Sequence, residues 1–211
     1  DQKELGQRDT FSFEEKAFLD SFVQAVLAGD IGKATNLMQG RKESIWVRHT
    51  VERQSVWATA DRAAQLIVAV DDIRENLGEA FESLSALFSF YSDEMRRIDR
   101  LHRELERAVT DTFGELDSVS ELVDIARQRY FELIEEIQSS FIKLVQKEGW
   151  PVSDQLRNTR VFEKFIEPEL KDRRKIAYFM VDALRYELGA ELEKELSGEF
   201  KTELTAVCAQ L

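Results

Sequence analysis

The chain has 211 residues, of which 43% are hydrophobic and 33% charged, and its formal net charge is -12. This length can bury a core in one or two domains, and the negative charge disfavours broad binding of the segment to the phosphate backbone of nucleic acids. Nine glycines and two prolines are too few for the many tight turns of an all-β fold. The single cysteine excludes an internal disulfide, and no apolar run is long enough to span a membrane.

The first helices are predicted from apolar residues that recur at helical spacing. One such stripe predicts a helix that ends at Gly29, because glycine is favoured just past a helix end. The next residue, Asp30, can cap a shorter helix over residues 31–38. Residues 44–50 are ambiguous, and fit either a short extended segment or a packed loop.

Three longer segments carry narrow apolar stripes with alternating steps of three and four residues, which indicate long amphipathic helices. They cover about residues 55–77, 80–110 and 119–148, and Gly149 closes the last of them. Short gaps between long helices predict an antiparallel arrangement. We therefore expect a mainly α domain over residues 1–172, built as an elongated helical bundle or coiled-coil-like arm.

Residues 173–211 change in character and predict the start of an α/β domain. An unbroken apolar run over residues 176–181 ends on Asp182, as expected of a strand buried on both faces. A helix over residues 184–196 and a second strand over 199–208 would complete a βαβ unit with a right-handed crossover. The exposed edges of these strands invite pairing with another chain, so a homodimer is one expected state.

Asp182 and Arg185 are the two candidate site residues. Ligands and metals collect beyond the carboxyl ends of parallel strands, where Asp182 would lie, but this spacing also suits an aspartate that caps the following helix. On spacing, the cap is favoured over a metal ligand. Arg185 could reach a phosphate near the start of that helix, or form a salt bridge to Glu187.

Other potential ligands are sparse. His49 and His102 are the two histidines, and without cysteine partners they form no zinc signature. His102 follows an apolar stripe and is predicted to be packed, whereas His49 is predicted at the surface. Cys208 is interpreted as a small apolar residue of the second strand, and a single cysteine fits a reducing compartment, which predicts a cytoplasmic protein.

Residues 175–188, KIAYFMVDALRYEL, carry a family resemblance. The motif VDALRYEL after a hydrophobic strand resembles the opening of the PglZ domain, a member of the alkaline phosphatase superfamily found in BREX-type bacterial phage-defence systems. Residues 43–49 (ESIWVRH) and 97–103 (RIDRLHR) resemble the helical region that precedes the catalytic domain in these proteins. The resemblance covers most of the chain, but its catalytic part covers only the C-terminal residues.

The resemblance implies a metal-dependent phosphatase, phosphodiesterase or nuclease that uses Zn²⁺, Mn²⁺ or Mg²⁺, with Asp182 as a metal ligand. No Asp or His follows Asp182, and the Ser or Thr nucleophile is expected beyond Leu211. We therefore expect a piece of a longer protein, with no catalytic residue and no activity of its own. Other defence-system proteins are the expected partners, with DNA contacted only indirectly or through the full-length protein. The alternative is a helical interaction or regulatory module that recruits such components.

Overall fold

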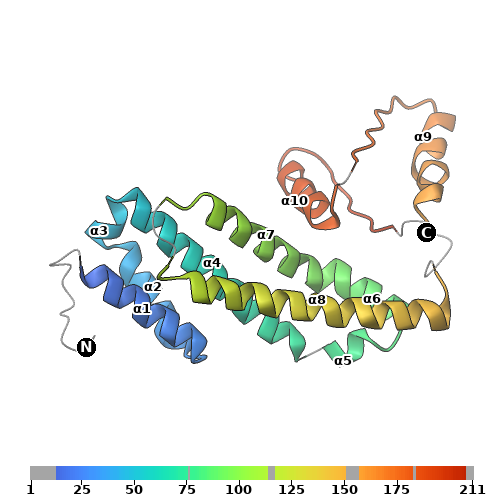
Figure 1. Cartoon of the computed structure of the whole chain (residues 1–211). Coiled ribbons are helices and arrows are strands. Elements are labelled where there is room, and N and C mark those ends of the chain that lie inside the picture. Colours follow the sequence, from blue (N-terminus) through green and yellow to red (C-terminus); the bar gives the residue numbers. More distant parts are fainter. Residues whose placement is uncertain (1–12, 76, 114–116, 151–156, 183, 208–211) are drawn as a thin grey trace. The chain divides into compact units, whose positions relative to one another are not determined.

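The computed structural model describes residues 13–75, 77–113, 117–150, 157–182 and 184–207. These residues are mainly helical, as predicted, and contain no β-strand (Figure 1). The α-helices are α1 (Glu14–Leu27), α2 (Ile31–Lys42), α3 (Ile45–Arg48), α4 (Val51–Arg74), α5 (Leu77–Ala80), α6 (Leu84–Phe90), α7 (Arg96–Thr110), α8 (Ser120–Glu148), α9 (Glu167–Lys171) and α10 (Tyr186–Leu196). Shorter π- or 3-10-helical turns are η1 (Tyr91–Met95), η3 (Asn158–Arg160) and η4 (Phe162–Ile166).

The chain forms two compact units. Unit 1 comprises Asp1–Arg74 and Leu101–Ile134, and unit 2 comprises Glu75–Arg100 and Glu135–Leu211. Helices α7 and α8 therefore each contribute residues to both units.

In unit 1, α1 ends before the predicted glycine and α2 begins at the predicted residue 31, but α2 continues to Lys42 rather than ending at residue 38. Gly29 has a φ of 73°, a left-handed conformation that glycine adopts without strain, and it separates α1 from α2. Asp30 caps α2, because its Oδ1 accepts a hydrogen bond from the Lys33 amide at 3.0 Å. The ambiguous segment after α2 is neither extended nor a loop: it forms the short helix α3, with Val47 buried.

The core of unit 1 lies along the apolar stripe of α4. The predicted stripe is confirmed, since all five of its members are buried: Val56, Ala60, Ala63, Ile67 and Val70. Leu105 of α7 and Leu122 and Leu133 of α8 are also fully enclosed, each at 0% exposure. Burial of these side chains removes apolar surface from water, which is the main favourable contribution to folding.

In unit 2 the core forms where α6 packs on the second half of α8. Leu84, Leu87 and Leu144 are buried there, with Phe141 and Trp150 packed against them. The helix predicted over residues 80–110 is interrupted, because Ser83 has extended backbone and its Oγ accepts from the Ala86 amide at 3.1 Å. This local hydrogen bond starts a new helix, α6, and a π-helical turn then separates α6 from α7.

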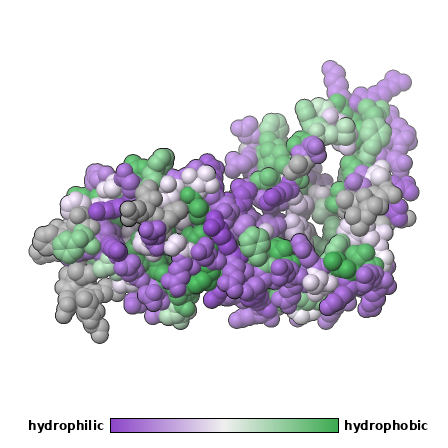
Figure 2. All heavy atoms as spheres, viewed as in Figure 1, coloured by the Kyte–Doolittle hydropathy of each residue, from purple (hydrophilic) through white to green (hydrophobic). Residues whose placement is uncertain are grey.

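The predicted strand–helix–strand unit is wrong in the part of the chain that the structure describes. Its central helix is present as α10, but residues 175–181 and 199–207 adopt no strand, and Cys208 lies outside the described residues. A strand needs neighbouring strands to pair its backbone N–H and C=O groups, and no such neighbour is formed here by the described residues. Apolar side chains of this region are consequently on the surface, as Figure 2 shows for the hydrophobic residues in green.

Candidate functional site

Asp182 lies in an exposed turn between the apolar segment and α10. The preceding side chains are strongly exposed: Phe179 at 82%, Met180 at 83% and Val181 at 62%. The alternative role of Asp182 as a helix cap is wrong, because the residue at the N-cap of α10 is Arg185. The Asp182 carboxylate is therefore presented to solvent rather than committed to the helix start.

Arg185 contributes its backbone to the start of α10. Its carbonyl oxygen accepts from the amides of Leu188 and Gly189, at 3.0 and 3.1 Å, and its own backbone is extended. The Arg185 side chain is exposed, whereas Glu187 is buried at 2% exposure. The guanidinium is thus exposed to solvent near the first turn of a helix, where anions are favoured.

No group of three or more His, Cys, Asp or Glu side chains that could hold a metal ion occurs among the described residues. A two-metal phosphoryl-transfer site needs several such ligands. The role of Asp182 as a metal ligand therefore stays a prediction. It requires further carboxylate or histidine ligands from outside the described residues.

An apolar cavity of about 330 Å³ lies within unit 2. It is lined by residues of α6, η1 and α8 together with Trp150, Tyr186 and Val207. Phe141 meets Trp150 edge to face beside it, with ring centroids 5.2 Å apart. The sequence gives no signal for this cavity, since its walls come from segments more than a hundred residues apart. It can take an apolar side chain or a small hydrophobic molecule.

A second cleft in unit 2 is lined by charges of both signs. Arg96, Arg97 and Arg100 of α7 face a hollow of about 250 Å³ that Glu187 and Glu191 of α10 also line. Asp93 and Lys194 also line it, so the acidic and basic groups nearly offset one another and the local net charge is small. The arrangement suits a structural contact between α7 and α10 better than a phosphate site.

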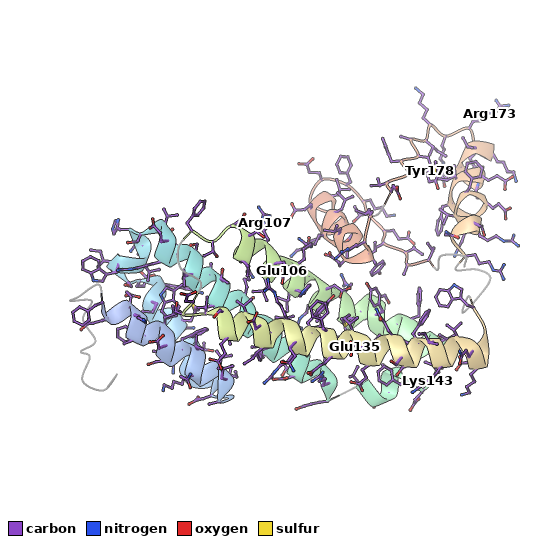
Figure 3. All side chains as sticks on the ribbon, in the orientation of Figure 1. Glu106, Arg107, Glu135, Lys143, Arg173 and Tyr178 are labelled. Atoms are coloured by element: carbon purple, nitrogen blue, oxygen red, sulfur yellow. The ribbon has the colours of Figure 1, made fainter. Side chains whose placement is uncertain are left out.

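In unit 1, His102 is packed, as predicted. Its ring stacks on Tyr130 with centroids 3.9 Å apart, and its Nε2 lies 3.6 Å from Glu106 Oε1. Glu106, labelled in Figure 3, accepts two hydrogen bonds from the Arg127 guanidinium, at 2.7 and 2.8 Å. These bonds lower the pKa of the Glu106 carboxyl below its ordinary value. These contacts join α7 to α8, so the role of the cluster is structural.

Comparison with family models, with curated proteins and with solved structures gave no match. Among the described helices, each is too short or too polar to cross a lipid bilayer.

Proposed function

We propose that this chain is the helical region and the opening segment of a PglZ-like, metal-dependent phosphatase, phosphodiesterase or nuclease of bacterial anti-phage defence. The observation that carries the proposal is the order of features at residues 178–188. An exposed apolar segment leads into an exposed Asp182, and α10 follows. Side chains such as Phe179 and Met180 suit a strand that is covered once neighbouring strands are present.

In this proposal Asp182 is one ligand of a Zn²⁺, Mn²⁺ or Mg²⁺ ion, and Arg185 binds a phosphate of the substrate. A carboxylate suits all three ions, and a guanidinium can make two hydrogen bonds to a phosphate. The other ligands and the Ser or Thr nucleophile come from residues beyond Leu211. Residues 1–211 are therefore expected to hydrolyse no phosphoester, and metal-dependent turnover by this segment would contradict the proposal.

The second candidate function is an interaction module within the cytoplasm, in which the helices recruit other BREX-type defence components or a second copy of the chain. The apolar cavity of unit 2 and the exposed Phe179 and Met180 favour it, because exposed apolar surface of this kind marks interaction sites. DNA would then be reached only indirectly or through the full-length protein.

The two candidates differ in what Asp182 does. In a form of the protein that extends beyond Leu211, Asp182→Asn should lower hydrolysis of a simple phosphodiester by at least about tenfold if Asp182 is a metal ligand. Asp172→Asn is the matched control, since Asp172 is also exposed and lies 3.8 Å from Arg174 in a surface ion pair. Equal activity of the two variants would refute the metal-ligand role and leave the interaction module.

A further inference from the structure

A groove of about 840 Å³ runs through unit 1, far in sequence from Asp182. It is bounded by α1, by the first half of α4 and by the residues that lead into α8. Its lining begins at Phe13 and continues to Gln24, eleven residues along α1, which corresponds to a length of about 16 Å. That length matches roughly three turns of a helix.

Acidic residues dominate the rim of the groove. Four exposed carboxylates line it, Asp20, Glu52, Asp117 and Glu121. The basic residues of the lining are Lys16 and Arg53, and the Arg53 guanidinium lies over the Trp46 ring at 5.9 Å. The rim therefore carries an excess of negative charge.

One wall of the groove adds a buried carboxylate. Glu15 is 5% exposed, and its Oε1 accepts from Arg41 at 2.9 Å and from Ser44 at 2.7 Å. Its Oε2 has no hydrogen-bond donor among the described residues. This oxygen is itself buried and the carboxylate is paired with Arg41, so the attraction for a basic partner comes from the exposed carboxylates of the rim.

The floor of the groove is apolar, with Leu19, Val23 and Trp57 in its lining, and Phe13 stands at one end with 70% of its surface exposed. A floor of this kind under an acidic rim is complementary to an amphipathic segment that carries both apolar and basic residues. A divalent ion fits less well, because no cluster of three possible ligands occurs among the described residues.

From this complementarity we propose that the groove binds a basic amphipathic helix of a partner protein. The apolar side of that helix lies over Leu19, Val23 and Trp57, and its Lys and Arg side chains pair with the carboxylates of the rim. Binding in this groove does not depend on any chemistry at Asp182, so it can be tested separately from the proposed hydrolase activity.

The test uses a labelled peptide of about 14 residues, with Leu at helical spacing (i, i+3, i+4, i+7) and Lys at the other positions, and fluorescence anisotropy at low salt. Replacing the four rim acids by their amides (D20N, E52Q, D117N and E121Q together) should weaken binding by at least about tenfold. The control removes the same charge from exposed sites outside the groove (E79Q, E195Q, E199Q and E203Q together) and should change binding less than about twofold. Equal weakening by both sets would show binding to net charge and overturn the proposal.

Two further measurements locate the peptide. With Trp46 and Trp150 replaced by phenylalanine, the emission of Trp57 should shift on addition of the peptide, and an unchanged spectrum would contradict binding in the groove. Deleting residues 1–12 should leave the affinity unchanged. If the peptide binds only after this deletion, the occupant is the chain's own N-terminal segment and the proposal of a partner helix is wrong.

Discussion

Replacing Arg41 by alanine should destabilise unit 1 by about 3 kcal/mol, because it leaves the buried charge of Glu15 without its cationic partner. The two side chains are 12% and 5% exposed, and their closest atoms, Arg41 Nη1 and Glu15 Oε1, are 2.9 Å apart. The Arg41 guanidinium also lies over the Phe18 ring, 4.1 Å from its centroid.

The magnitude follows from this environment. Removing one partner of a buried ion pair typically costs about 3–5 kcal/mol. The lower end applies here, because Ser44 still donates to Glu15 and the alanine leaves space through which water can reach the carboxylate. Neutralising Glu15 in the same background (R41A with E15Q) should recover part of this loss, since the amide keeps an acceptor for Ser44 and carries no charge.

Urea unfolding followed by circular dichroism measures the effect, as a lower midpoint with an unchanged slope. The matched control is Arg107→Ala, at the position labelled in Figure 3. Arg107 pairs with Asp111 at 3.4 Å, but these side chains are 80% and 64% exposed, so the loss should stay below about 1 kcal/mol. If Arg41→Ala costs no more than this control, the reasoning from burial is refuted.

Three other predictions concern stability. Hydrogen bonds from Arg127 hold the pKa of Glu106 below its ordinary value of 4.5, so the stability they contribute is present above that pH and is lost as the pH falls through the lowered pKa. The melting temperature should therefore fall less steeply from pH 6 to 3 for Glu106→Gln than for the wild type. Parallel curves of melting temperature against pH would contradict this link. Leu105→Ala should cost about 2–5 kcal/mol in urea unfolding because Leu105 is fully buried, whereas Leu192→Ala, at a side chain 50% exposed, should cost much less. Gly149→Ala should lower the free energy of unfolding by about 1 kcal/mol in the same assay, because the φ of 84° at the end of α8 is strained for alanine. An unchanged midpoint would contradict this strain and show that the backbone at this end of α8 adjusts to alanine.

The long helices were predictable because their apolar residues repeat with the period of a helix. The stripe of α4, from Val56 to Val70, is buried as that period requires. The break before α6 was missed, since a serine at residue 83 is compatible with a helix interior and becomes a cap only when its backbone is extended. Periodicity therefore located the helices better than it located the interruptions within them.

The candidate site was harder to predict, because an apolar run does not specify what covers it. Residues 176–181 carry the composition of a buried strand, yet Phe179 and Met180 are more than four-fifths exposed in the described structure. Pairing with other strands is a long-range property that this run cannot encode by itself. The groove beside Glu15 was missed for a related reason, since its lining comes from three separate helices.

The metal content of the protein tests directly whether Asp182 is a metal ligand. A form extending beyond Leu211 should retain a divalent metal after dialysis. Asp182→Asn should lower its metal affinity by at least about tenfold, while Asp172→Asn should not. Equal metal content and affinity in the two variants would show that Asp182 is no ligand, and would remove the main support for a hydrolase.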